Sequence, residues 1–330
     1  MEQRVLGRSG IAVSPLGMGC WAIGGVWRFL NISGGWGEVD DAESIRTVQY
    51  ALANGVTFFD TAATYGAGHS EAILGRALAG QRDKVVIATK FGWDVNEAEK
   101  QVNHYAHPRM VIDRLQEDCE RSLRHLNTDY IDLYQLHVWD YPLEHIPDLL
   151  EALEKLVEQG KIRSYGWSTD NVEGARIFAQ GAHCAAVQHD LNVVRPAPAM
   201  LALCEALDLA SVNRSPLARG ALTGKYSQRT SFAEFAENDV RRDPWSWDTF
   251  FAPTLRQLDA LRDILTSEGR SLTQGALAWI WAASKRTVPI PGIRTAQQAQ
   301  ENIAAMRFGP LNAAQMRQID EALRLNTPVS

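Results

Sequence analysis

Short runs rich in apolar and β-branched residues alternate with longer amphipathic segments from one end of the chain to the other. The runs number about eight and cover residues 15–20, 57–60, 85–90, 131–137, 164–168, 185–188, 211–215 and 288–291. Such alternation is typical of βα units, in which parallel strands are joined by helices. Several runs, VVIATK among them, are almost continuously apolar, as expected of strands covered on both faces. The pattern predicts a buried parallel sheet surrounded by helices.

The segments between the runs carry helix signals. Apolar residues recur at spacings of three and four after Asp41, and Asn54 with Gly55 provides a stop. We expect another helix to open at Pro108, and Gly160 to close the one before the fifth run.

The length of 330 residues allows two medium domains or one large α/β unit. No linker rich in Ser, Gly or Pro separates two halves, so the units predict one (β/α)8 TIM barrel domain over residues 1–330. Extra helices and long loops are expected around it. Residues 4–15 predict an N-terminal β-hairpin that turns at Ser9 and Gly10, and residues 226–252 form a long polar connection containing tryptophan.

The charge balance limits the partners. Lys and Arg number 33 against 39 Asp and Glu, a formal net charge of −6, which argues against nucleic acid or an anionic membrane. The four cysteines are scattered without CxxC spacing, which favours a reducing cytoplasm. The start of the chain lacks an apolar signal core, and no stretch approaches the ~20 apolar residues of a membrane span.

Polar residues stand where the predicted strands end. They are Asp60, Lys90, His137, Ser168, Gln188, Arg214 with Ser215, and Gly292 with Arg294 after the last run. Barrel enzymes carry their chemistry at this end of the strands. A single polar residue there is more often a helix cap or a loop anchor, but a whole set in register favours an active site.

Four of the polar side chains suit acid–base chemistry. Asp60 and Lys90 at neighbouring strand ends would pair, because burial of either charge alone is costly. Tyr65 follows on a glycine-containing turn, and a nearby Lys90 ammonium would lower the pKa of its phenol from about 10. His137 would hydrogen-bond a carbonyl oxygen from the other side. Taken singly, the same residues also fit a structural ion pair, a packed tyrosine and a core histidine.

The chain resembles the aldo-keto reductase family, of the bacterial type, along almost its whole length. The blocks DTAATYG, VVIATKFG, YIDLYQLHVWD, GKIRSYGWSTDN, SPLARGALTGKY and VPIPGIRTAQQAQEN follow in family-like order and spacing. The resemblance implies an NADPH-dependent carbonyl reductase on a (β/α)8 barrel. It also implies a catalytic tetrad of Asp60, Tyr65, Lys90 and His137.

The resemblance further implies where a nicotinamide cofactor binds. A formal GxGxxA match at residues 17–22 is rejected as a Rossmann fingerprint, because Pro15 interrupts the strand before it. The implied contacts near the nicotinamide and its ribose are Gly19, Cys20, Trp21, Asp60, Ser168, Thr169 and Gln188. Thr169 replaces the usual Asn of the family. Arg214 replaces a common aromatic residue, and either stacking on the ring or a phosphate contact is open to it.

The implied phosphate and adenine contacts lie in the last two blocks. Ser215, Leu217, Gly220 and Lys225 would meet the pyrophosphate, and Gly292 and Thr295 begin a helix whose N-terminus favours an anion. Arg294 and Gln298 would bind the 2′-phosphate, and Glu301 and Asn302 the adenine. Arg294 is the main reason to expect NADPH or NADP⁺, with NADH weaker, and no metal is expected.

The predicted reaction is hydride transfer to the carbonyl carbon of an aldehyde or ketone, with sugars and hydroxy-aldehydes also compatible, and Tyr65 as general acid and base. Tryptophans are expected along the pocket, namely Trp27, Trp93, Trp139, and Trp245 and Trp247 of the 226–252 loop. A metal hydrolase needs more His and carboxylate ligands, and a glycosidase needs two facing carboxylates. The remaining alternative is a cofactor-binding regulatory subunit, similar to potassium-channel β subunits. Those typically lack the strand-end His, so His137 favours an enzyme.

Overall fold

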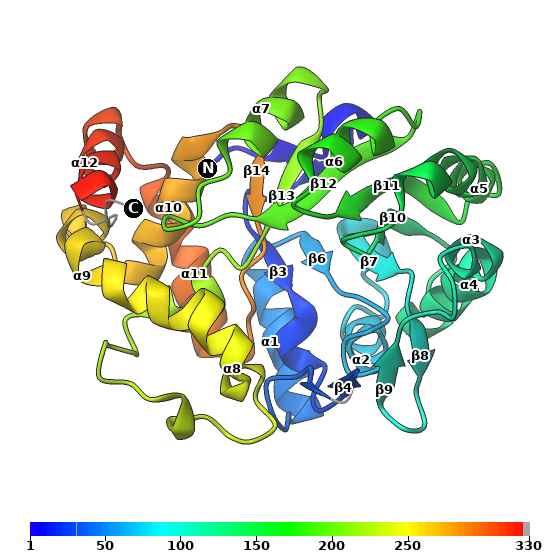
Figure 1. Cartoon of the computed structure of the whole chain (residues 1–330), viewed down its shortest axis with the longest axis horizontal. Helices are drawn as coiled ribbons and strands as arrows, with labels where there is room; N and C mark the ends of the chain where they lie inside the picture. The colour runs from blue at the N-terminus through cyan, green and yellow to red at the C-terminus, as the bar shows by residue number, and fades with distance from the viewer. Residues whose placement is uncertain (31, 326–330) are drawn as a thin grey trace.

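Eight parallel strands form the central sheet in the computed structural model, which describes residues 1–30 and 32–325. In order across the sheet they are β14 (Thr287–Pro289), β13 (Ala210–Arg214), β12 (Cys184–Asp190), β11 (Ile162–Ser168), β10 (Ile131–Leu136), β7 (Val86–Phe91), β6 (Phe58–Asp60) and β3 (Gly17–Gly19). A parallel bridge between Gly19 and Gly292 joins the two edges, and the Gly19 N–H donates to the Pro291 carbonyl at 2.9 Å. The sheet is thus closed into a barrel (Figure 1).

Alternate strand residues fill the barrel interior, because side chains along a strand point to opposite faces. Phe58, Ala88, Leu133 and Val212 belong to this interior cluster. The hairpin of β1 (Arg4–Val5) and β2 (Ala12–Val13) adds apolar side chains to the same cluster, namely Leu6, Ile11 and Val13. The hairpin therefore closes the N-terminal end of the barrel and leaves the opposite end to the site.

Helices surround the barrel, as Figure 1 shows. They are α1 (Asp41–Ala53), α2 (His69–Ala77), α4 (Leu115–Leu126), α5 (Ile146–Glu158), α6 (Val172–Phe178), α7 (Pro198–Ala206), α10 (Leu272–Ala283) and α11 (Ala296–Phe308). Outward-facing strand residues such as Phe59, Ile87 and Val187 pack against them in a large apolar cluster. The predicted (β/α)8 barrel with an N-terminal hairpin is confirmed.

Additional elements depart from the sequence-based expectations. The helix expected to open at Pro108 is divided into α3 (Met110–Asp113) and α4 at Arg114, whose φ of −100° and ψ of −4° depart from those of a regular α-helix. Residues 226–252 hold short helical turns and α8 (Pro244–Ser246), and they lead into α9 (Ala252–Leu265). Helix α12 (Ala313–Leu325) packs on α9.

A second small sheet was not expected from the sequence. It is formed by β5 (Ile32–Ser33), β4 (Arg28–Phe29), β9 (Gln101–Asn103) and β8 (Asp94–Asn96). The sheet joins the loop after β3 to the loop after β7, at the C-terminal end of the barrel strands. It therefore builds a wall beside the mouth of the barrel.

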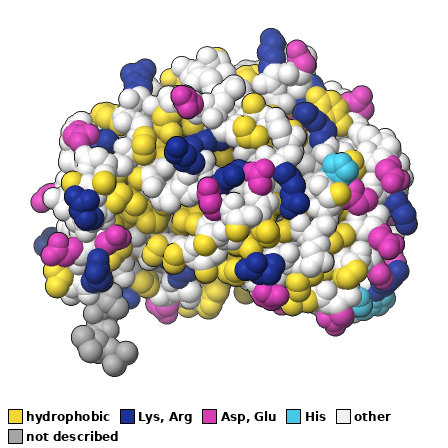
Figure 2. All heavy atoms as spheres, turned by 90° about the horizontal axis from the view of Figure 1, so that it is seen from above, with side chains coloured by type: hydrophobic (Ala, Val, Ile, Leu, Met, Phe, Trp, Pro, Cys, Tyr) yellow, Lys and Arg dark blue, Asp and Glu magenta, His cyan; other side chains and the backbone are white. Residues whose placement is uncertain are grey.

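The surface has mixed charge on the face that carries α6 and α7. Figure 2 shows Lys and Arg side chains interspersed there with Asp and Glu and with apolar side chains. In the part of the chain that the structure describes, no helix combines the length and the apolar character needed to cross a bilayer.

Candidate active site

Three side chains meet at the C-terminal ends of β6 and β7. The Lys90 Nζ donates to Asp60 Oδ1 at 2.5 Å, to the Thr61 carbonyl at 2.7 Å and to the Tyr65 hydroxyl at 3.2 Å. Lys90 and Asp60 are almost fully buried, and Tyr65 is partly buried. The structure thus brings together the carboxylate, ammonium and phenol that the sequence placed at neighbouring strand ends.

His137 completes the group from the other side of Tyr65. Its imidazole meets the Tyr65 ring edge-on, with the ring centroids 5.9 Å apart, and its Nδ1 lies 3.4 Å from Thr64 Oγ1. His137 follows β10, whose Gln135 is in register with Lys90. A carbonyl placed over the mouth can therefore reach the phenol and the imidazole together.

The second oxygen of Asp60 is held by two amides. Gln188 Nε2 donates to Asp60 Oδ2 at 2.7 Å, and Gln135 Nε2 donates to the same atom at 3.0 Å. Gln188 was predicted as a cofactor contact, and its amide nitrogen here faces the carboxylate. Gln135 was missed by the sequence reasoning, although its place in an apolar strand two residues before His137 is a signal. These amides fix the carboxylate that faces Lys90.

Burial and charge act in opposite directions on Lys90 and Tyr65. Burial lowers the pKa of Lys90, but the Asp60 carboxylate and Tyr65 outweigh it, so the pKa is raised and the ammonium stays charged. Burial raises the pKa of the Tyr65 phenol, and Lys90 only partly opposes this. The expected lowering of the Tyr65 pKa is therefore wrong in its net direction, because desolvation outweighs the ammonium.

His137 stays neutral near pH 7. Burial lowers the pKa of its imidazole well below the ordinary value, and the positive charges of Lys90 and Arg214 act in the same direction. A neutral imidazole has one N–H donor and one acceptor nitrogen, so it can donate a hydrogen bond to a carbonyl oxygen.

A tight turn places Tyr65 over the mouth. Gly66 has a φ of +65°, and a Cβ there would lie 1.9 Å from the Gly24 carbonyl oxygen. A residue with a side chain would clash at this position even if it adopted the conformation. The Trp21 ring stacks on Tyr65, with the centroids 5.9 Å apart and 19° between the planes. The turn and the stacked ring together fix the phenol.

Aromatic side chains wall one side of the mouth. Trp93 is buried, and its Nε1 donates to the His137 carbonyl at 3.3 Å. Phe29, His104 and Trp139 pack around Trp93, with Trp139 about half exposed at 49%. Trp27 belongs to the same cluster. These rings border the space above Tyr65 and His137.

The tryptophans of the long loop lie differently. Trp247 stacks on Phe251 within the loop, at 5.1 Å between centroids. Trp245 is exposed and meets Phe250 edge-on. The structure places neither in contact with the ring cluster around Trp93 within the described residues.

The residues predicted beside the nicotinamide occupy different depths. Gly19, Trp21 and Ser168 lie at the mouth, where Ser168 is in register with Gln188. The Cys20 side chain is fully buried, and its Sγ contacts the Met18 carbonyl at 3.6 Å. The Thr169 hydroxyl is also buried, and it donates to the Trp139 carbonyl at 2.9 Å. The Cys20 and Thr169 side chains therefore face the protein interior.

The loop after β13 has an unusual backbone. Ser215, Ala218 and Arg219 have φ values of +51°, +47° and +55°, and Gly220 follows at +94°. Leu217 is buried, whereas Lys225 is exposed at the end of the loop. These residues close turns in which the N–H groups of Ala218, Gly220 and Leu222 donate to the carbonyls of Ser215 and Leu217.

Arg219 in this loop was missed by the sequence reasoning. Its Nε is buried without a hydrogen-bond partner among the described residues, and burial lowers its pKa to about 10. A buried donor of this kind needs an acceptor, which a phosphate oxygen can supply.

Arg214 forms an ion pair with Asp170. This contact was not foreseen from the sequence, which left ring stacking and phosphate binding open for Arg214.

The residues after β14 form a helix start. The Thr295 side chain caps α11 and accepts from the Gln298 N–H at 3.3 Å, and Gln298 Oε1 accepts from the Arg294 N–H at 2.8 Å. The Arg294 guanidinium donates to the carbonyls of Trp36, at 2.9 Å, and Glu38. Gly292 is exposed beside this helix start.

Glu301 and Asn302 lie further along α11. Glu301 Oε1 accepts from Ser271 at 2.9 Å, and Asn302 is buried at 3% exposure. Asn302 therefore faces the packed side of the helix.

The loop after β3 and the loop after β13 meet beside Arg294. Ser33 Oγ donates to the Asn238 carbonyl at 2.6 Å, and the Val240 N–H donates to the Gly35 carbonyl at 2.8 Å. Residues 33–38 and 238–240 therefore form a strap beside the mouth.

These donors fit a nicotinamide dinucleotide. Buried Arg219 Nε lacks an acceptor among the described residues, Lys225 is exposed at the end of the same loop, and a capped helix begins after β14. No group of three or more His, Cys, Asp or Glu side chains is arranged to hold a metal ion within the described ranges 1–30 and 32–325.

Comparisons with known proteins agree with this geometry. The family model described as "Aldo/keto reductase family" matches residues 15–324. The aldo-keto reductase YhdN of Bacillus subtilis is 33% identical, with 98% of this chain and 94% of that protein covered. The NADH-specific methylglyoxal reductase of Escherichia coli is 27% identical, with 98% and 99% covered. The structure of the glycerol dehydrogenase AKR11B4 from Gluconobacter oxydans superposes with a TM-score of 0.80 at 31% identity, with 97% and 94% covered.

Proposed function

Since the chain belongs to the aldo/keto reductase family and is an NAD(P)-dependent oxidoreductase of carbonyl compounds, we propose that it uses NADP(H) and reduces small aldehydes or ketones with Tyr65 as the proton donor. The contact of Lys90 with both Asp60 and Tyr65 carries this proposal. The three groups form a relay at the mouth of the barrel, next to a neutral imidazole.

Tyr65 gives its proton to the carbonyl oxygen during reduction. As the proton leaves, negative charge forms on the phenol oxygen, 3.2 Å from the Lys90 ammonium, which stabilises it. Asp60 keeps Lys90 charged and in place through the 2.5 Å ion pair. In alcohol oxidation the same phenol oxygen takes the proton back.

His137 orients the carbonyl oxygen opposite Tyr65. Its neutral imidazole donates a hydrogen bond, which fixes the oxygen and shares its developing charge. Trp21 stacks on Tyr65, and Trp93 binds the backbone of His137, so both rings border the reacting groups.

The cofactor supplies the hydride at its nicotinamide ring. Gly19, Trp21, Asp60, Ser168 and Gln188 are proposed to hold the nicotinamide end, with Cys20 and Thr169 contributing backbone atoms because their side chains face inward.

The phosphates are assigned to the loop after β13 and to the start of α11. Ser215, Leu217, Gly220 and Lys225 would meet the pyrophosphate, together with Arg219. Arg294 and Gln298 would bind the 2′-phosphate at the helix start formed by Gly292 and Thr295, and Glu301 and Asn302 would meet the adenine. Arg294 favours NADPH over NADH, because a guanidinium pairs strongly with a phosphate dianion.

The substrates proposed are small aldehydes, hydroxy-aldehydes and aldoses. The aromatic wall around Trp93 suits both apolar faces and the CH faces of sugars. Two similar proteins are named as a methylglyoxal reductase and a glycerol dehydrogenase, and the compounds in both names are small. The cysteines Cys20, Cys119, Cys184 and Cys204 are free and buried, which supports a reducing cytoplasm as the location.

The test is NADPH oxidation with a panel of aldehydes, ketones and sugars. We expect Tyr65→Phe to lose nearly all reduction, by at least about 10²-fold, while it still binds NADPH in a fluorescence titration. Tyr50→Phe, on α1, should retain full activity. Full turnover by Tyr65→Phe would contradict the assignment of the proton donor. NADPH binding by the wild type without turnover on any carbonyl would instead support the regulatory alternative.

A further inference from the structure

We propose that Asp170 is a positioning residue that fixes the guanidinium of Arg214 at the barrel mouth, so that the charge of Arg214 acts on the acid–base pair of Tyr65 and Lys90. The inference rests on the proposed function, because it concerns the protonation of Tyr65 during turnover.

Asp170 joins the ends of neighbouring strands. It lies in the loop between β11 and α6, and one carboxylate oxygen accepts from the Asp190 N–H of β12 at 2.8 Å. The other oxygen pairs with Arg214, the last residue of β13. Asp190 and Arg214 are themselves in register. One carboxylate therefore ties the C-terminal ends of β12 and β13 to the loop after β11.

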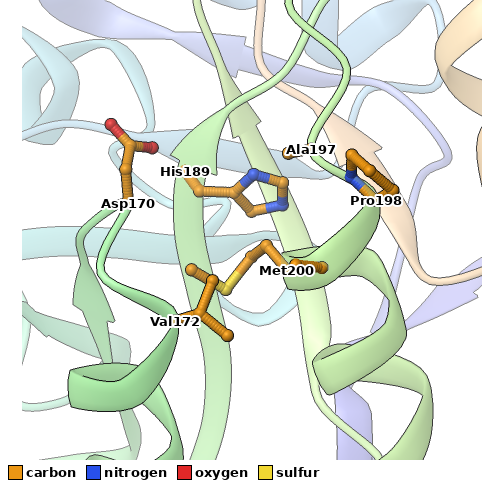
Figure 3. Close-up of a pocket in the computed structure, with 7 residues that line it drawn as sticks. Asp170, Val172, His189, Ala197, Pro198 and Met200 are labelled. Atoms are coloured by element: carbon orange, nitrogen blue, oxygen red, sulfur yellow. The ribbon is translucent and has the colours of Figure 1, made fainter.

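Asp170 is one of the residues that line a cavity beside β12. That cavity has a volume of about 220 Å³, and His189, Val172 and Met200 line it with Asp170 at its edge. Figure 3 shows the Asp170 carboxylate pointing away from the imidazole of His189. His189 is bound instead to Ser211 Oγ at 2.7 Å. The carboxylate is thus available to Arg214 and not engaged by the pocket.

Strand alternation directs Arg214 toward the mouth. Ala210 and Val212 belong to the interior cluster, and Arg214 continues the same parity along β13. On the neighbouring strand Gln188 has inward parity and reaches Asp60. Arg214 therefore stands at the level above Gln188 and Asp60, on the side of the reacting groups.

Several charged groups surround Tyr65 and Arg214 at the mouth of the barrel. Tyr65 faces Lys90 and Asp60, with the neutral His137 beside it. The positive charge of Arg214 opposes the larger effect of burial, which raises the pKa of Tyr65, and it adds to the lowering of the pKa of His137. The further charges around Arg214 are Asp170, Asp190, Arg195 and Arg219.

Asp170 is needed because Arg214 has competing positions. The Arg214 side chain is 32% exposed, so this flexible side chain can also turn toward solvent. Asp190 is a second carboxylate that attracts the Arg214 guanidinium. The positive charges of Arg219 and Arg195 lie in the same region and repel the guanidinium. Without Asp170 the guanidinium would leave the mouth, and the phenol would lose a charge that favours its ionised form.

The experiment is a pH profile of kcat/KM for alcohol oxidation at saturating NADP⁺, which reports the ionisation of Tyr65 as the base. We expect Asp170→Ala and Arg214→Met each to raise the apparent pKa of this profile by about half a unit to one unit. The double variant should show the same rise as Arg214→Met alone, because Asp170 acts through Arg214.

Asp170→Asn separates charge from backbone support. It retains an acceptor for the Asp190 N–H but loses the ion pair, so it should shift the profile as Asp170→Ala does. If Asp170 acted on Tyr65 by its own negative charge, its removal would lower the apparent pKa instead. A fall in the apparent pKa, no change in it, or additive shifts in the double variant would each overturn the proposal.

Glu173→Gln is the matched control. Glu173 lies on α6 and forms an exposed ion pair with Arg176 at 3.5 Å, so its loss should leave the profile unchanged. Inactivity of the wild type toward every alcohol and carbonyl would reject the proposed function. An active wild type with an unchanged profile in the Asp170 variants would reject this inference alone.

Discussion

Lys90 and Asp60 form an ion pair with 2.5 Å between Nζ and Oδ1, and the two side chains are 0% and 2% exposed. A buried pair of this kind is costly to break from one side, because the remaining charge stays desolvated. The same two residues serve the proposed proton transfer, so stability and activity depend here on one contact.

The substitution Lys90→Met should lower both the stability of the fold and the rate of carbonyl reduction. We expect a loss of about 3–5 kcal/mol in the free energy of unfolding, because Asp60 remains buried without its partner. Carbonyl reduction should fall by at least about 10²-fold, since the phenolate of Tyr65 loses its stabilising cation. Urea unfolding and NADPH oxidation measure the two effects.

Lys161→Met is the matched control. Lys161 pairs with Glu120 at 2.6 Å, but both side chains are partly exposed, at 25% and 43%. Its loss should cost less than about 1 kcal/mol and leave activity unchanged. An equal loss of stability in the two variants would show that burial of the Lys90 pair has no special weight.

Gly66→Ala should displace the turn that carries Tyr65. The added Cβ would lie 1.9 Å from the Gly24 carbonyl oxygen, so the backbone must move in addition to bearing a φ of +65°. We expect a loss of at least about 2 kcal/mol in stability and a fall of at least about 10-fold in kcat, because the phenol leaves its place beside Lys90. Thermal unfolding and steady-state kinetics measure these effects.

Gly80→Ala separates backbone strain from the clash. Gly80 has a similar φ of +72°, but its Cβ would meet no described atom within 4 Å. It should cost about 1 kcal/mol and preserve kcat. A similar loss of kcat in the two variants would contradict the role of the Gly66 turn.

The barrel and its polar strand ends were predictable because their signals are local. Lys90 closes the apolar run VVIATK, and Asp60 ends the run before it, so the parallel order of the strands places both residues at the same end of the sheet. Tyr65 was found from the glycine turn after Asp60. Each of these signals lies within a few residues of the strand or turn that it identifies.

The remaining features depend on contacts distant in the sequence. The small sheet pairs Arg28 with Gln101, and strands of two or three residues give no periodic signal. The pKa of Tyr65 follows from a balance between burial and the charge of Lys90, and burial is a tertiary property. The pairing of Asp170 with Arg214 depends on the register of β12 and β13, which the sequence does not fix.

His189 should make the protein less stable in acid. Burial lowers the pKa of its imidazole to about 4, below the ordinary value of about 6.5, so the unfolded chain binds the proton more readily. Stability is therefore fully present above about pH 6.5 and is lost as the pH falls toward 4. Between pH 7 and pH 5, the free energy of unfolding of His189→Gln, measured with urea, should fall by about 2 kcal/mol less than that of the wild type. His107 lies in the exposed loop before α3. Over the same pH range, the free energy of unfolding of His107→Gln should fall by as much as that of the wild type. Identical pH dependence in the wild type and His189→Gln would contradict the assignment.

The substitution Arg294→Ala should weaken the binding of NADPH more than the binding of NADH. The guanidinium lies at the start of α11, where Thr295 caps the helix and the N-terminal dipole favours an anion. Loss of a charge-assisted pair with the 2′-phosphate should raise the Kd for NADPH by roughly 10- to 100-fold, and the Kd for NADH should change by less than about 3-fold. Fluorescence titration with each cofactor measures both constants.

The alternative role of Arg294 predicts a different pattern. Its guanidinium also donates to the carbonyls of Trp36 and Glu38, and so supports the strap of residues 33–38 and 238–240. If this support were its main role, the loss of Arg294 would loosen the strap and weaken NADPH and NADH equally. Arg307→Ala, at the exposed end of the same helix, controls for a change in overall charge and should alter neither constant. Equal weakening of the two cofactors by Arg294→Ala would therefore remove the main reason to prefer NADP(H), because the 2′-phosphate is the group by which the two cofactors differ.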